Sequence, residues 1–98
     1  MASRNIISTI TNISSWPVKK FSDITAKHIA DLIVLRPELI IIGSGNKARF
    51  LPDQCSFLAL SNNIGIETMD SGAACRSYNL LQSDGRRIVA GLLLPGAD

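Results

Sequence analysis

The sequence has few of the residues that bind metals or carry out covalent catalysis. It contains one histidine, His28, and two cysteines, Cys55 and Cys75, which do not form a Cys-x-x-Cys pair. A zinc site needs about four such ligands, so we expect neither a metal site nor a metal cofactor. No histidine lies near either cysteine in the sequence to make a catalytic pair, and we expect both thiols to be reduced and buried.

Charged and aromatic residues are also sparse. Charged side chains make up 18% of the chain, aromatic side chains make up 5%, and the net charge is +2. The lysines and arginines are scattered, with no run that alternates with aromatic residues, and this argues against nucleic-acid binding. The apolar stretches are too short to span a bilayer, so we expect no transmembrane segment.

The N-terminal segment is basic, rich in serine and threonine, and free of acidic residues before Asp23. This composition loosely resembles a mitochondrial presequence. However, isoleucines recur through the segment, and β-branched residues favour a strand. We therefore expect a strand over residues 5–13, which Trp16-Pro17 interrupts because proline has no amide hydrogen to donate.

Hydrophobic residues make up 46% of the 98 residues, a composition that is typical of a globular protein. We expect one domain over residues 1–98 with one modest core. A chain of this length buries only about 60–65% of its unfolded surface, and pairing with a second copy would cover more. A homodimer is therefore one of the partnerships that we consider.

Predicted helices and strands alternate along the rest of the chain. Thr25 and Ser71 suit the starts of helices, whereas Pro37 and Asn63 suit their ends. Such alternation indicates an α/β fold with a mostly parallel or mixed sheet and helices against its faces. The expected helices lie near residues 25–35, 52–62 and 71–83, and the expected strands lie at 39–42, 64–69 and 88–94.

Two short loops follow neighbouring strands of the predicted sheet. Because parallel strands place their carboxyl ends at one edge, we expect these loops to meet there. Glycines expose backbone amides and a helix begins at the same place, so this edge could receive an anion or an acidic side chain. The residues of this candidate binding edge are Gly43, Ser44, Gly45, Asp70, Ser71, Gly72, Arg76 and Arg86.

Structural interpretations of the same residues stay open. Asp70 or Ser71 would serve equally well as the cap of a helix, and Asp70 could neutralise a neighbouring arginine. Gly43-x-Gly45-x-x-Ala48 fits the dinucleotide fingerprint loosely, but the segment before Pro52 delays the helix that must face the pyrophosphate. We therefore expect no bound cofactor.

Three segments together carry a resemblance to a known family. Residues 37–45 resemble its "P-E-hydrophobic-G-T-G" segment, residues 65–71 resemble "GI-x-VE-x-MDT", and residues 73–90 resemble "AACRTYN-x-L-x-x-EGR-x-VA". Trp16 matches the early tryptophan of the family, and the match runs over residues 16–94. This domain-of-unknown-function family includes the adipogenesis-associated domain protein, a mitochondrial respiratory complex I assembly factor and bacterial hypothetical proteins.

The resemblance implies a three-layer β/α domain with an additional β-hairpin and no settled activity. The family usually has a longer N-terminal β segment, so we expect a small or abbreviated one here. A non-enzymatic binding or assembly module with a protein partner is the favoured function. The alternative is a small-molecule or anion-binding protein or enzyme that uses the edge at Gly43 and Asp70. We expect a bacterial cytoplasmic protein, or a mitochondrial one if its source is eukaryotic.

Overall fold

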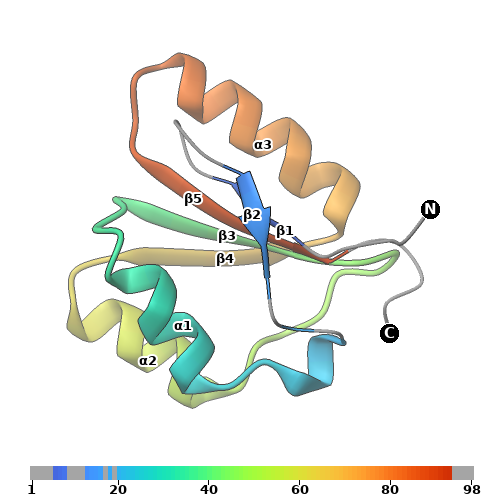
Figure 1. Cartoon of the computed structure of the whole chain (residues 1–98), viewed down its shortest axis with the longest axis vertical. Helices are drawn as coiled ribbons and strands as arrows, with labels where there is room; N and C mark the ends of the chain where they lie inside the picture. Colours follow the sequence, from blue (N-terminus) through green and yellow to red (C-terminus); the bar gives the residue numbers. More distant parts are fainter. Residues whose placement is uncertain (1–5, 9–12, 17, 19, 94–98) are drawn as a thin grey trace.

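The computed structural model describes residues 6–8, 13–16, 18 and 20–93 (Figure 1). Three parallel strands form one side of its five-stranded sheet, and an antiparallel pair forms the other side. The strands are β1 Ile6–Ser8, β2 Ile13–Ser15, β3 Leu39–Ser44, β4 Gly65–Met69 and β5 Ile88–Leu93. Their order across the sheet is β2-β1-β5-β3-β4, with β3 parallel to both β4 and β5. The mixed sheet that the sequence predicts is confirmed.

Helices cover both faces of this sheet. They are the 3₁₀ turn η1 Phe21–Asp23 and the α-helices α1 Ala26–Ile33, α2 Asp53–Ser61 and α3 Ser71–Ser83. Helices α1 and α2 pack together on one face, and α3 covers the other (Figure 1). The α/β class and the three layers are therefore as predicted. Among the described residues, no helix is long and apolar enough to cross a membrane.

The central strands form because their side chains are apolar on both faces. Ile40 and Ile42 of β3 pack into the core beneath α1 and α2. Leu39 and Ile41 alternate with them and pack against α3 on the opposite face. All six residues of β3 are buried, which explains why its first four residues are continuously apolar.

Trp16 fixes the segment after β2 to the sheet. Its indole is buried and lies directly over Gly91 of β5, because a Cβ atom placed on Gly91 would come within 2.8 Å of the ring. Gly91 therefore provides the space into which the indole packs. Through this contact Trp16 contributes to the hydrophobic core between the sheet and α1.

The ends of α1 and α2 follow local signals. Thr25 caps α1, and its backbone N–H donates to His28 Nδ1 at 3.0 Å. Helix α1 ends at Ile33, slightly before the predicted end, and Arg36 has a left-handed φ of 56°. Asn63 has a φ of 60° after α2 and closes that helix in the left-handed conformation that the sequence predicts.

The prediction of a single strand over residues 5–13 is wrong. The segment forms two short strands, and Ile6 of β1 lies opposite Ser15 of β2 in an antiparallel pair. The β-branched residues that recur through the segment favour a strand but do not reveal where such a segment turns back. Residue 5 and residue 94, which the predicted strands also included, lie outside the described residues.

The two cysteines lie in different environments, whereas the sequence predicts burial for both. Cys55 is buried in the core beneath α1 and α2, and this burial raises the pKa of its thiol. Cys75 is exposed because the buried stripe of α3 runs through Ser71, Ala74 and Tyr78, one residue away. In the described part of the chain, no three His, Cys, Asp or Glu side chains gather to hold a metal ion.

Candidate functional site

The loops after β3 and β4 meet at the carboxyl edge of the sheet. The backbone N–H of Ser71 donates to Gly45 O at 2.8 Å, and the Gly45 N–H donates to Ser71 Oγ at 2.9 Å. Strands β3 and β4 are parallel neighbours, so their carboxyl ends come together as the sequence analysis expects. We call this region the carboxyl edge. It comprises Gly43, Ser44, Gly45, Asp70, Ser71, Gly72 and Arg76.

The two hydroxyls of the carboxyl edge bind the protein's own backbone. Ser44 is fully buried, and its single hydroxyl proton is shared between two acceptors within hydrogen-bond distance of Oγ, Lys47 O and Met69 O. Ser71 is also buried, and its Oγ donates to Leu93 O while it accepts from Gly45. These bonds join the ends of β3, β4 and β5 to the start of α3. Both serines are therefore structural in this arrangement.

The glycines of this edge allow a close approach between β3 and α3. A Cβ atom on Gly43 would lie 2.9 Å from Leu92 Cδ2 and 2.9 Å from Ser71 Oγ, which is too close for an unstrained contact. Gly45 has a φ of 89°, a left-handed conformation that favours glycine. These two positions are occupied by glycine for reasons of packing and backbone geometry.

Asp70, Gly72 and Arg76 form the outer part of the carboxyl edge. Asp70 caps α3, because its Oδ1 accepts from Ala73 N at 2.9 Å; Ser71, which the sequence also favoured as the cap, is instead the first helical residue. Gly72 and Arg76 are exposed, and a Cβ on Gly72 would lie 3.5 Å from Arg76 Nη1. The guanidinium therefore lies over the first turn of α3, where it could meet an acidic group.

Arg86 does not belong to this edge, contrary to the sequence prediction. It precedes β5 and lies at the amino end of the parallel strands, where its Nε is 3.8 Å from Glu38 Oε1. Helix α3 carries the chain back across the sheet, so residues that follow the helix must lie at the opposite edge. Both side chains of this pair are about half exposed, and we assign the pair little stabilising energy.

A polar hollow of about 460 Å³ lies at this amino edge. Arg87 binds its own chain there, because its Nε donates to Arg36 O at 3.2 Å and its backbone N–H donates to Glu38 Oε2 at 2.9 Å. The hollow is therefore a junction between the end of α1 and the starts of two strands. Its lining residues are Ile33, Arg36, Pro37, Glu38, Asn62, Asn63, Ile64 and Arg87.

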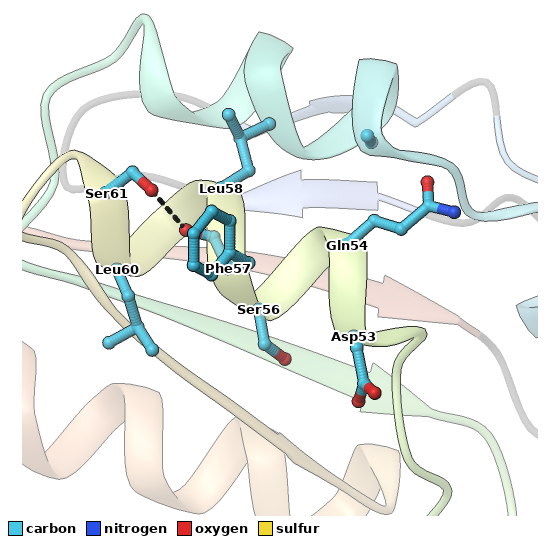
Figure 2. Close-up of a pocket in the computed structure, with 8 residues that line it drawn as sticks. Asp53, Gln54, Ser56, Phe57, Leu58, Leu60 and Ser61 are labelled. Atoms are coloured by element: carbon cyan, nitrogen blue, oxygen red, sulfur yellow. Dashed lines mark hydrogen bonds between the residues drawn. The ribbon is translucent and has the colours of Figure 1, made fainter.

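The outer face of α2 is apolar and open to solvent. Cys55 and Ala59 face the core, yet Phe57 is 72% exposed and Leu60 is 64% exposed on the outward side. These side chains border a hollow of about 690 Å³ (Figure 2). Its lining residues are Ala26, Asp53, Gln54, Ser56, Phe57, Leu58, Leu60 and Ser61. We call this surface the α2 face.

With the fold and these surfaces described, comparison with known proteins identifies the family. A model of a family described as a protein of unknown function, DUF498/DUF598, matches residues 2–93. The chain belongs to the DUF498/DUF598 family. The resemblance read from the three sequence segments is therefore confirmed.

Several known proteins and solved structures are similar to this DUF498/DUF598 chain. NADH dehydrogenase [ubiquinone] 1 alpha subcomplex assembly factor 3 of Rattus norvegicus is 31% identical over 85 residues, which are 85% of this chain and 46% of that protein. The chain thus spans about half the length of this relative. A crystal structure of a Bordetella parapertussis protein is 35% identical, with a TM-score of 0.88 over 94% of this chain and 80% of that one. An NMR structure of a Xanthomonas campestris protein is 28% identical, with a TM-score of 0.88 over 99% and 74% of the two chains.

The α2 face is the feature of this DUF498/DUF598 member that the sequence analysis missed. A helix with one buried face normally has a single apolar stripe. Here apolar residues lie on the inward side at Cys55 and Ala59 and on the outward side at Phe57 and Leu60. That pattern in a helix covering one face of a sheet is the signal that could have revealed an exposed apolar surface.

Proposed function

We propose that this protein is a non-catalytic protein-binding module of the assembly-factor type, and that it binds through the α2 face. The observation that carries the proposal is the exposure of Phe57 and Leu60 side by side on one helix. Single exposed apolar residues are ordinary, but a contiguous apolar surface around a hollow is typical of an interaction site. A partner that covered these two side chains would remove most of their area from water.

The chemistry of the α2 face favours a protein over a small polar ligand. Asp53 is the only charged residue in its lining, and it lies at the start of the helix. The aromatic ring of Phe57 offers the kind of apolar anchor that is enriched at the centres of protein interfaces. The hollow is open to solvent and is lined by the side chains drawn in Figure 2, so it suits an apolar side chain from a partner surface.

The relatives support the type of partner that we propose. Several of them are named assembly factors of NADH dehydrogenase, at about 30% identity over about 85% of this chain. By analogy, we propose that the partner is a subunit or a further assembly factor of a multisubunit membrane complex, such as a respiratory complex. The shared fold and the exposed α2 face are compatible with transient binding during such an assembly.

Binding at the carboxyl edge stays a second prediction. The buried members of that edge already hydrogen-bond one another, so the groups left for a ligand are Asp70, Gly72 and Arg76. A carboxylate from a ligand or a partner could bind Arg76 there. The α2 face exposes two large apolar side chains beside a hollow, and we favour it for that reason.

Site-specific photo-crosslinking in the native cell tests the proposed function. Benzoylphenylalanine at position 57 should form an adduct with a protein partner, whereas the same group at position 80 should not. Leu80 is a matched control because it is 66% exposed on α3, close to the 64% exposure of Leu60. Leu60→Ser should lower the yield of this adduct, whereas Leu80→Ser should leave the yield unchanged.

The size of this effect follows from the area that binding would cover. Burying the exposed part of Leu60 contributes about 1–2 kcal/mol, so Leu60→Ser should weaken partner binding by about 5- to 30-fold. Neither serine variant should unfold the protein, because both leucines are solvated in the free chain. Equal adduct yields at positions 57 and 80, or indifference to Leu60→Ser, would contradict the proposal.

A further inference from the structure

Strand β4 is an edge strand with one unpaired side. It is the last strand in the order β2-β1-β5-β3-β4, and among the described residues it pairs only with β3. Edge strands in native proteins are usually protected by proline, lysine, a bulge or a covering segment. The five residues Gly65–Met69 contain neither proline nor lysine, and they pair with β3 in unbroken register.

The direction of the backbone groups along β4 can be derived from one hydrogen bond. Gly65 N donates to Glu38 O at 3.2 Å, so the backbone groups of Gly65 point toward β3. Because successive residues of a strand alternate, those of Glu67 and Met69 also point toward β3. The N–H and C=O groups of Ile66 and Thr68 therefore point outward, where an added strand would meet them.

The side chains of β4 give this free edge two different faces. Ile66 packs against the core beneath α1 and α2, and Met69 packs against the core beneath α3. By alternation, Thr68 lies on the same face as Ile66, and Glu67 lies on the α3 face. Glu67 is exposed, and it makes no ion pair with any residue in the described part of the chain.

The α2 face lies next to this free edge. Helix α2 packs against β4, and Figure 2 shows Leu60 pointing from α2 toward the side where β4 runs. A strand added to β4 would therefore point every second side chain toward the α2 side of the sheet, where Leu60 lies. One bound segment could both hydrogen-bond to the outward backbone groups of β4 and cover the exposed side chain of Leu60.

From this geometry we propose that an extended segment of a partner protein adds to β4 as a further strand. This segment has a lysine or arginine opposite Glu67 and apolar residues on both sides of it, which face α2. The inference rests on the proposed function and specifies the partner: a strand with an apolar-basic-apolar pattern, bound by backbone hydrogen bonds to Ile66 and Thr68.

Glu67 also argues against a second copy as the occupant. It is the central residue of β4, so antiparallel pairing of two β4 strands in register would place Glu67 opposite itself. Like charges directly opposite each other destabilise a strand pair, and a charge in the middle of an edge strand is a known protection against self-pairing. The same charge attracts a basic residue on a different strand.

The test uses the full 98-residue chain and two synthetic peptides. Both peptides have an acetylated N-terminus and an amidated C-terminus, and both alternate threonine and valine. They differ only in the central residue, which lies between two valines and is lysine in one peptide and glutamate in the other. The lysine peptide should bind saturably to the original protein, and the glutamate peptide should bind several-fold more weakly. In Glu67→Lys this preference should reverse, with a change on the order of fivefold for each peptide.

The backbone contact is tested separately at Thr68. Thr68→Pro removes the outward N–H without removing a donor to β3, which is the kind of edge position where proline is tolerated. Thr68→Val keeps the N–H and serves as the matched control. Peptide affinity should fall by about tenfold or more with proline and stay within about twofold with valine, because one buried hydrogen bond is lost only in the former.

Hydrogen exchange gives an independent readout of the same contact. The amides of Ile66 and Thr68 should exchange rapidly in the free protein and become protected when the lysine peptide binds. No saturable binding of that peptide, unchanged exchange at these two amides, or equal affinities of the proline and valine variants would overturn the inference. If Leu60→Ser abolishes the cellular adduct while Thr68→Pro leaves it intact, the proposed function stands and strand addition is wrong. If neither variant affects the adduct, both are wrong.

Discussion

Replacing Gly43 with alanine tests whether the carboxyl edge is held together as tightly as its contacts indicate. The added Cβ would lie 2.9 Å from Leu92 Cδ2, 2.9 Å from Ser71 Oγ and 3.0 Å from Ser71 Cα. The leucine side chain can move, but the backbone of Ser71 is fixed by its bond to Gly45 O. The methyl group must therefore push the first turn of α3 away from β3.

The expected cost combines overpacking with weakened hydrogen bonds. Inserting a methyl group into a well-packed core costs about 1–3 kcal/mol, and a hydrogen bond that is weakened costs about 1 kcal/mol more. Ser71 takes part in bonds to both Gly45 and Leu93, so we expect Gly43→Ala to lower the free energy of unfolding by about 2–4 kcal/mol.

Urea denaturation followed by tryptophan fluorescence measures this change. Trp16 is the single tryptophan and is buried in the core, so its emission reports unfolding directly. With a slope of about 1–1.5 kcal/mol per molar urea, the midpoint should fall by about 2 M. The slope itself should not change, because the same core is exposed on unfolding.

Gly72→Ala is the matched control. Its Cβ would meet Asp70 Oδ1 at 3.3 Å and Arg76 Nη1 at 3.5 Å, both on side chains at the surface end of α3. Alanine is also the better helix former, so this variant should be neutral or up to about 1 kcal/mol more stable. If Gly43→Ala were as stable as the original protein, or if both variants lost equal stability, the structural interpretation of the edge would be refuted.

The remaining predictions concern the outer part of the carboxyl edge and the two thiols. Asp70→Asn should change stability by less than about 0.5 kcal/mol, because asparagine caps a helix as well as aspartate does. If the edge binds a ligand or partner, Asp70→Asn and Arg76→Ala should weaken that binding, and unchanged binding in both would exclude the edge. A thiol reagent should modify Cys75 rapidly in the native protein and Cys55 only on unfolding. Because burial raises the pKa of Cys55, the unfolded state loses this proton first, and stability should fall as pH rises above the ordinary thiol value of 9.0. Cys55→Ala should remove this part of the alkaline loss, which a urea series at increasing pH would measure.

Strong local signals explain why most of the elements could be predicted. The uninterrupted run from Leu39 to Ile42 suits a strand that is buried on both faces, and the structure places it inside the sheet, between β5 and β4. Asn63 stops α2 because it adopts the left-handed conformation easily. The meeting of the loops after β3 and β4 follows from topology alone, once the strands are parallel neighbours.

The wrong predictions concern residues whose positions depend on how the helices and strands are arranged in three dimensions. The sequence prediction places Arg86 at the carboxyl edge, but Arg86 follows α3, and a helix that crosses back over the sheet ends at the amino edge. Cys75 is one position from the buried Ala74, and a rotation of about 100° per residue moves it out of the core. The hairpin of β1 and β2 could not be located because isoleucines and threonines, which favour a strand, recur through the whole segment.

The carboxyl edge and the α2 face should respond in opposite ways to substitution, and this separates structural residues from binding residues. Ser44, Ser71 and Gly43 are buried and hydrogen-bonded or closely packed, so their substitution lowers stability in the free protein. Phe57 and Leu60 are mostly solvated, so their apolar area contributes little to folding and becomes useful only when a partner covers it. A variant of Leu60 that keeps its denaturation midpoint yet loses the partner would therefore place the function on the α2 face.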